Sequence, residues 1–258
     1  MMTDKSLKIS AILITKNAKH SIEKCLDSIS FLDEIIVVDS GSEDGTVEYA
    51  QNFGARVFRH NWIGFGPQKN YAVSLAKHDI VFCIDSDEVV SDELRQSILS
   101  LTSLDDGGYW ITRRNLFLGS WLSHGEAYPD RLIRLFDRRR AQWDTSEVHE
   151  KVVEVNGKQI SKVLSGDLLH FSADSIESYL SKQNRYTSIQ AKLLYKNGVR
   201  IGLVRLLISP VFRFIKMYLI KRGFLDGIPG LIHILIGSYA TFMKYAKLYE
   251  YQLNDENK

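Results

Sequence analysis

Short apolar runs alternate with amphipathic segments along the first hundred residues of the chain. A run in which almost every position is apolar is typical of a strand buried on both faces, and apolar residues three and four apart are typical of a helix. We therefore predict strands at 8–15 (KISAILIT), 34–39 (EIIVVD), 55–60 (ARVFRH) and 79–85 (DIVFCID). Strands that alternate with helices predict an α/β fold whose parallel sheet carries helices on both faces.

Residues that favour helix ends stand between these strands. Ser21 and Ser91 precede segments with helical periodicity, as expected of N-caps. Pro67 suits a first helical turn. The segment from Asp44 ends at Gly54, which is a common residue just after a helix.

The pattern changes after residue 108. Longer segments with mixed faces predict further strands, and a helix is predicted from about Ser175 to Asn197, ending at Gly198. The strand segments are 109–119 (YWITRRNLFLG), 131–139 (RLIRLFDRR), 148–155 (VHEKVVEV) and 160–172 (ISKVLSGDLLHFS). We predict one domain at 1–200, with halves at 1–105 and 106–200, followed by a helical segment at 201–258.

The segments 202–224 and 227–251 are rich in Leu, Ile, Phe and Tyr, with Arg or Lys every few residues. Neither has the roughly 18 uninterrupted apolar residues expected of a spanning helix. Interleaved basic and aromatic residues on apolar helices favour a position in a membrane interface. The alternative is that both helices pack on the rest of the chain or on a partner subunit.

Composition narrows the class of protein. The chain has 258 residues and a formal net charge of +2, which argues against the clustered basic excess of a nucleic-acid-binding protein. Its two cysteines, Cys25 and Cys83, fall in a predicted helix and a predicted strand. We therefore predict two buried free thiols in a reducing compartment. No secretory signal is visible, because the first apolar run has only six residues, ISAILI.

Polar residues follow three of the predicted strands: Thr15-Lys16-Asn17, Asp39-Ser40-Gly41-Ser42 and Asp85-Ser86-Asp87. Ligands of parallel α/β sheets bind at the carboxyl ends of the strands, so these residues are expected to line one pocket. Side chains two apart on an extended backbone point the same way. Asp85 and Asp87 are therefore expected to face one site, where Mg²⁺ or Mn²⁺ with a substrate diphosphate would suit them.

Other classes also use acidic residues in this spacing. A calcium loop is excluded, because Val90 stands where the loop requires glycine. A haloacid-dehalogenase-like phosphatase, with its D-x-D-x-V loop, stays open as an alternative. Its second acidic signature has no clear match, since Asp174 lies too far from Asp167.

Several motifs in order carry a resemblance to a known family: ILITKN, VVDSGSEDGT, GFGPQKNYA and IDSDE. On them the chain resembles the family-two glycosyltransferases, which have the GT-A fold. The later motifs RRNLFLGSWLSHGEAYPDRLIRLFDRR, VHEKV, LLHFS and KRGFLDGIPGL are similar to the bacterial lipopolysaccharide core β-1,4-glucosyltransferase subgroup. Arg131 departs from that pattern on the acceptor side.

The resemblance implies roles on the donor side, which the half at 1–105 would supply. Asp39 would contact the uracil or ribose of a sugar nucleotide, and Asp85 the ribose or sugar. Lys69 would lie near the donor, and Asp87 would bind the metal ion. Thr15 and Asn17 would line the same nucleotide pocket.

It also implies roles on the acceptor side. An inverting transfer needs a carboxylate that takes the proton of the acceptor hydroxyl. Asp130, which follows the conformationally restricted Pro129, is the predicted base, and Glu126 and Glu150 are its alternatives. Three further residues are expected at the diphosphate, the metal or the acceptor: Arg134, His149 and His170.

The function implied is transfer of glucose from UDP-glucose to the inner-core heptose of a lipid-linked lipopolysaccharide. The implied cofactor is a divalent metal, Mg²⁺ or Mn²⁺, and nucleic acid is not an expected partner. Such an enzyme would be cytoplasmic and bound to the inner face of the inner membrane. A non-catalytic nucleotide-binding scaffold and transfer to another lipid-linked or cell-surface glycan are the remaining alternatives.

Overall fold

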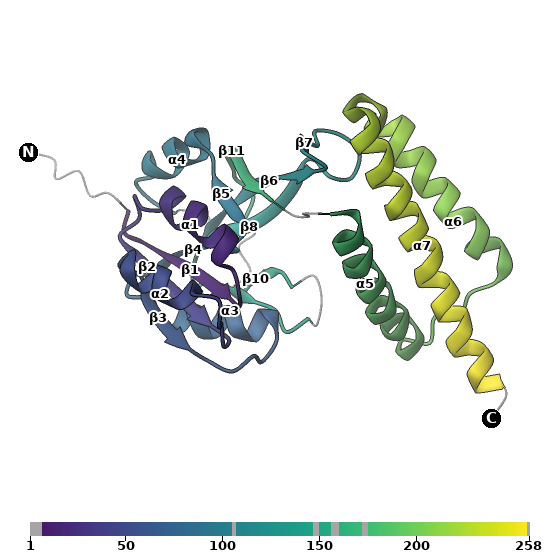
Figure 1. The fold of residues 1–258 in the computed structure, drawn as a ribbon, viewed down its shortest axis with the longest axis horizontal. Coiled ribbons are helices and arrows are strands. Elements are labelled where there is room, and N and C mark those ends of the chain that lie inside the picture. The colour runs from purple at the N-terminus through teal and green to yellow at the C-terminus, as the bar shows by residue number, and fades with distance from the viewer. Residues whose placement is uncertain (1–6, 105–106, 147–149, 156–159, 172–174, 257–258) are drawn as a thin grey trace, which may run out of the picture. The chain divides into compact units, whose positions relative to one another are not determined.

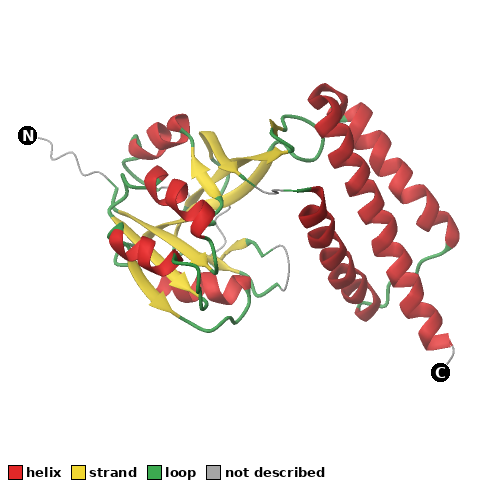
Figure 2. Cartoon of the chain, in the orientation of Figure 1, coloured by secondary structure: helices red, strands yellow, loops and turns green. Residues whose placement is uncertain are grey.

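The computed structural model of the chain describes residues 7–104, 107–146, 150–155, 160–171 and 175–256 (Figure 1). These residues form two compact units. The first comprises residues 1–113 and 130–170, and the second comprises residues 114–129 and 171–258. Figure 2 shows the first as a sheet with helices and the second as mainly helical.

The sheet of the first unit has strand order β3-β2-β1-β4-β8-β6-β11-β5. Strands β3, β2, β1 and β4 run parallel to one another, whereas β8 is antiparallel to both β4 and β6. The predicted parallel sheet is therefore confirmed for the first four strands. The strand bounds are β1 Ile9–Thr15, β2 Glu34–Asp39, β3 Arg56–Arg59, β4 Ile80–Cys83, β5 Glu88–Val90, β6 Gly108–Phe117, β8 Asp130–Asp137 and β11 Val163–His170. A separate pair joins β9, Ala141–Trp143, to β10, Val152–Glu154.

Both faces of the parallel strands are buried, as their continuous apolar sequences require. On β1, Ala11 and Leu13 join one core cluster, whereas Ile12 joins another. The first cluster includes side chains of α1 (Lys19–Ser28), α2 (Thr46–Asn52) and α4 (Asp92–Leu99), and the second includes those of α3 (Phe65–Ser74). Cys25 and Cys83 are free and buried, as predicted.

Two of the local predictions were wrong. Ser21 does not cap α1, since the helix begins at Lys19 after Ala18, and the Ser21 hydroxyl instead donates to the Ala18 carbonyl within the first turn. The backbone is also not extended through the D-x-D motif, because β4 ends at Cys83 and the chain turns before β5. Ser91, by contrast, caps α4 by accepting a hydrogen bond from the Leu94 amide.

The described residues of the second unit form three long helices and short intervening turns. They are α5 Ile176–Lys196, α6 Leu203–Ile215 and α7 Gly227–Glu256, with η1 Lys216–Ile220 and η2 Gly223–Asp226 between α6 and α7. The short strand β7, Ser120–Trp121, pairs with the end of β6. The predicted boundary at residue 200 stays a prediction. We note that α5 packs against α7 and belongs to the same compact unit as α6.

Candidate functional site

The carboxyl ends of β1, β2 and β4 lie at one edge of the sheet, because the three strands are parallel neighbours. The turn after β2 is built on Asp39. Its Oδ1 accepts the amides of Gly41 and Ser42 at 3.0 and 2.9 Å, and its Oδ2 accepts the Ser42 hydroxyl. Asp39 is fully buried. The observed role of Asp39 is to stabilise this turn. Its contact with the uracil or ribose of a nucleotide stays a prediction.

The loop after β1 is joined to that turn. Asn17, with φ of 51°, donates its amide to the Ser42 hydroxyl and accepts the Glu43 amide on its side-chain oxygen, at 2.8 and 3.0 Å. The hydroxyl of Thr15 is buried and has no hydrogen-bond partner among the described residues. Most buried polar groups are paired, so this hydroxyl is a candidate contact for a ligand.

The acidic turn after β4 is held by two buried cations. Asp85 Oδ1 lies 3.1 Å from Lys69 Nζ, and Asp85 Oδ2 lies 2.6 Å from Arg134 Nη2. Glu88 is fully buried, accepts the Asp85 amide at 2.9 Å and lies 3.0 Å from the same Arg134 nitrogen. The Asp85 carbonyl accepts the Glu88 amide, which closes the turn.

Neighbouring charges determine the protonation states of Asp85 and Arg134. Burial would raise the pKa of the Asp85 carboxyl, but the nearby charges of Arg134 and Lys69 hold it well below its ordinary value. Burial would likewise lower the pKa of Arg134, but the carboxylates of Asp85 and Glu88 raise it above its ordinary value. Asp85 is therefore ionised at neutral pH and Arg134 charged.

Glu88 also connects this turn to the predicted base. Arg113 Nη1 lies 3.4 Å from Glu88 Oε1, and the Nε and Nη2 of Arg113 donate to Asp130 Oδ2 at 2.9 and 2.7 Å. Asp130 Oδ1 has no partner among the described residues. The sequence analysis missed Glu88 and Arg113, although the DSDE run placed an acid next to the motif. Nothing in the sequence paired Arg113 with Asp130, because their register appears only when β6 meets β8.

Lys69 contacts Glu150 and Trp143 in addition to Asp85. Its Nζ lies 2.9 Å from Glu150 Oε1 and 4.4 Å from the ring centroid of Trp143. A Cβ on Gly66, one turn earlier in α3, would lie 1.9 Å from the Asp144 carbonyl oxygen. Only glycine therefore allows α3 to approach this segment so closely.

Asp87 points to a different partner from Asp85. Its Oδ2 lies 3.3 Å from His170 Nε2, and 40% of its side chain is exposed. The premise of an extended backbone was wrong, because Ser86 and Asp87 lie in a turn and not on a strand. That both aspartates face one site stays a prediction. No cluster of three His, Cys, Asp or Glu ligands occurs in the described part of the chain. The Asp87 carboxylate nonetheless fits Mg²⁺ or Mn²⁺, which take few protein ligands when substrate phosphates supply the rest. A metal contact by the His170 nitrogen stays a prediction.

Two candidates remain, Glu126 and His149. Glu126 belongs to the second unit, where it pairs with Arg213 and lies 3.8 Å from His233 Nδ1. Burial raises the pKa of Glu126 and outweighs the charge of Arg213. His149 lies outside the described residues.

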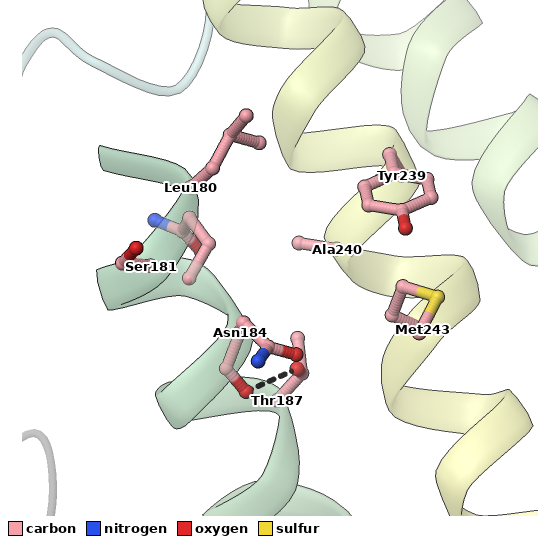
Figure 3. A pocket seen from close by; sticks show the side chains of 8 residues that line it. Leu180, Ser181, Asn184, Thr187, Tyr239, Ala240 and Met243 are labelled. Atoms are coloured by element: carbon pink, nitrogen blue, oxygen red, sulfur yellow. Dashed lines mark hydrogen bonds between the residues drawn. The ribbon is translucent and has the colours of Figure 1, made fainter. Parts of the chain in front are cut away.

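A pocket of about 290 Å³ between α5 and α7 is lined by residues of the second unit alone. Figure 3 shows Leu180, Tyr239 and Met243 around it. Asn184 accepts the Thr187 hydroxyl and, with Thr187, accepts Lys247 Nζ, so these polar groups are already paired within the helices. None of the site residues named above lines this pocket.

Ligands of parallel α/β sheets bind at the carboxyl ends of the strands, which is where this chain places Asp85 with its two cations, Lys69 and Arg134. The chain matches the model of glycosyl transferase family 2 over residues 10–151, which is more than half of its length. It is 34% identical to an uncharacterized glycosyltransferase of Rickettsia typhi, over 97% of this chain and 89% of that protein. The chain therefore belongs to glycosyl transferase family 2, and the enzyme is a glycosyltransferase. The phosphatase and scaffold alternatives find no support.

Two further relatives are informative. The chain is 28% identical to the lipopolysaccharide core biosynthesis glycosyltransferase LpsC of Rhizobium meliloti, over 95% of this chain and 93% of that protein. The crystal structure of mannosyl-3-phosphoglycerate synthase from Rubrobacter xylanophilus is similar, with a TM-score of 0.50 and 19% identity, over 76% of this chain and 77% of that chain. This likeness confirms the predicted GT-A fold.

Proposed function

We propose that the enzyme transfers a hexose, with inversion, from a UDP-sugar to a lipid-linked acceptor of the lipopolysaccharide core. The observation that carries the proposal is the continuous set of ion pairs from Lys69 through Asp85, Arg134, Glu88 and Arg113 to Asp130. It joins the predicted donor contacts to the predicted base within one compact unit. UDP-glucose is the favoured donor.

The charge balance of the site favours a divalent cation. Five carboxylates take part in its ion pairs, those of Asp85, Asp87, Glu88, Asp130 and Glu150, against three permanent cations, Lys69, Arg113 and Arg134. A diphosphate would be repelled by this excess of negative charge. Asp87 and His170 would hold Mg²⁺ or Mn²⁺, which would neutralise the negative charge that develops on the leaving diphosphate.

Asp130 would act as the base. The free Oδ1 would accept the proton of the acceptor hydroxyl while Arg113 holds Oδ2 and orients the carboxylate. The acceptor oxygen would attack the anomeric carbon from the side opposite the diphosphate, the bond from that carbon to the phosphate oxygen would break, and UDP would leave. Arg113 is thus a positioning residue, since it acts through Asp130. Glu150 is the rival candidate, with one carboxylate oxygen paired with Lys69 as Asp130 is paired with Arg113.

The acceptor proposal rests on the relative in lipopolysaccharide core biosynthesis. An inner-core heptose is the favoured acceptor sugar. Because such an acceptor is embedded in a bilayer by its lipid, the enzyme would act at the cytoplasmic face of the inner membrane. The helices at 201–258 would bring it there, and 1–200 would contain the catalytic residues.

The test is a transfer assay with purified enzyme, UDP-glucose, Mn²⁺ and a truncated lipopolysaccharide that ends in heptose. We expect UDP release that depends on the acceptor, and a product whose new linkage is β by its anomeric proton coupling. Matched reactions use UDP-galactose as donor and lipid A without heptose as acceptor. An α-linked product, or equal turnover with lipid A, would refute the inverting mechanism or the acceptor, respectively.

A further inference from the structure

The helical segment 203–220, which comprises α6 and η1, has an exposed side made almost entirely of apolar residues. None of the residues of α6 or η1 is buried. Nine apolar side chains are exposed by 43% to 71%: Leu203, Val204, Leu207, Ile208, Val211, Phe212, Ile215, Leu219 and Ile220. Their spacing of one, three or four residues places them on one side of the helix. We call this set the α6 face.

The same apolar character continues after the helix. Phe224 and Leu225 in η2 and Ile228 at the start of α7 are exposed by 46%, 56% and 73%. An apolar surface of this extent is unusual for a protein that meets only water, and it commonly marks an interaction site.

Charge indicates what covers the α6 face. The other exposed positions of the segment are basic, Arg205 and Lys216, and Lys221 and Arg222 follow directly. No acidic residue occurs between 203 and 222. An apolar face bordered by Lys and Arg alone is complementary to a bilayer with anionic headgroups, because apolar side chains enter the acyl boundary while the cations meet phosphates.

The opposite side of α6 is fixed within the second unit. Leu206 packs on the cluster of Ala191, Ile201 and Leu248, and Arg213 pairs with Glu126. The helix therefore cannot rotate to bury its apolar side in this unit without breaking both contacts.

The helix α7 is the competing membrane element, since residues 223–255 are long and apolar enough to span a bilayer. Its contacts favour another role. Lys247 Nζ donates to Asn184 and Thr187 of α5, and the side chain of Gln252 both accepts from and donates to the backbone of Ile201. A spanning α7 would place these polar contacts among lipid chains.

We propose that the α6 face lies flat in the interface of an anionic membrane, and that α7 holds α6 in place without crossing the bilayer. The proposal rests on the proposed function only for its purpose, which is access to a lipid-linked acceptor. Binding to lipid itself needs neither donor nor acceptor.

The test is flotation of the full-length protein with vesicles of phosphatidylethanolamine and phosphatidylglycerol, and with vesicles of phosphatidylcholine alone. A triple variant, Leu207→Gln, Val211→Gln and Ile215→Gln, removes one row of the α6 face. The matched control variant carries Ile176→Gln, Leu193→Gln and Leu253→Gln, which are exposed apolar positions outside the face. We expect the partition onto anionic vesicles to fall by about 100-fold for the first variant and by less than about threefold for the control.

Several outcomes would overturn the proposal. Wild-type protein that stays unbound at low salt has no lipid-binding surface. Equal losses of vesicle binding in the two variants mean that binding is not specific to the α6 face. Bound protein that resists extraction by alkaline carbonate indicates that α7 spans. A dimer that the α6-face substitutions dissociate, without vesicle binding, indicates a second copy as the partner. UDP binding, measured for each variant in parallel, separates failure of this proposal from failure of the proposed function.

Discussion

Replacing Glu88 by Gln tests whether the buried ion pairs organise the site. The carboxylate is fully buried and interacts with Arg134, with Arg113 and with the Asp85 amide. Glutamine has nearly the same size and still offers an oxygen to the amide. The substitution therefore removes charge and leaves the packing almost unchanged.

The magnitude follows from the contacts that remain. Removing one partner of a buried ion pair usually costs about 3–5 kcal/mol, because the other charge is left unpaired. Here Arg134 keeps Asp85 at 2.6 Å, and Arg113 keeps Asp130 at 2.7 Å. We therefore expect a smaller loss, about 2–3 kcal/mol in the free energy of unfolding.

Activity should fall as well, since both arginines lose a shared anchor. A displacement of about 1 Å at reacting groups can lower the rate by about 100-fold, so we expect kcat to fall by about 10- to 100-fold with a small change in the KM for the donor. Urea unfolding and steady-state kinetics measure the two effects.

The matched control is Glu48→Gln, an exposed glutamate of α2 in the same unit, which should change stability by no more than about 0.5 kcal/mol. The reasoning fails if Glu88→Gln unfolds at the same urea concentration as the Glu48 variant and retains wild-type kcat. In that event the ion pairs are incidental to both stability and catalysis.

Three further predictions follow from other contacts. Asp130→Asn should lower kcat by about 10²–10⁴-fold with nearly unchanged UDP-sugar affinity, whereas Glu150→Gln should lower kcat by less than about tenfold. A larger loss of kcat for Glu150→Gln than for Asp130→Asn in steady-state kinetics would assign the base to Glu150. Gly66→Ala should lower stability by about 1–3 kcal/mol in urea unfolding, because its Cβ would meet the Asp144 carbonyl oxygen; an unchanged midpoint would contradict that close approach. Burial and the charge of Arg213 lower the pKa of His233 to about 4, so the unfolded chain binds this proton more readily than the folded chain. The free energy of unfolding should therefore decrease by up to about 3 kcal/mol as the pH falls from about 6.5 to 4. His233→Phe should flatten this pH dependence in urea titrations at each pH.

The strands of the parallel half could be predicted because local pattern determines them. Burial on both faces requires apolar residues at nearly every position of β1, β2 and β4, and the chain has them. Ser21 shows the limit of local signals. A serine ahead of an apolar periodicity resembles a cap, but α1 begins earlier and leaves Ser21 inside its first turn.

Several residues of the site could be predicted from the sequence, but the contacts between them could not. Asp85, Lys69 and Arg134 were all expected at one site, and in the structure Asp85 lies 3.1 Å from Lys69 and 2.6 Å from Arg134. Glu88 and Arg113 were missed, because their partners lie on strands that are distant in sequence. The turn at Ser86 and Asp87 was missed because a spacing of two residues does not reveal whether the backbone is extended.

Calorimetric titration of UDP into the wild-type enzyme and into Asp87→Asn, each with and without Mn²⁺, tests the central claim most directly. The claim is that the acidic turn after β4 binds a nucleotide diphosphate through a divalent cation. We predict that Mn²⁺ strengthens UDP binding to the wild type by at least about tenfold, because Asp87 would hold a cation that offsets the charge of the phosphates. The variant should lose this gain while its metal-free affinity is unchanged. Wild-type binding that is equally tight without any divalent cation, or a variant that responds to Mn²⁺ as fully as the wild type, would contradict the account.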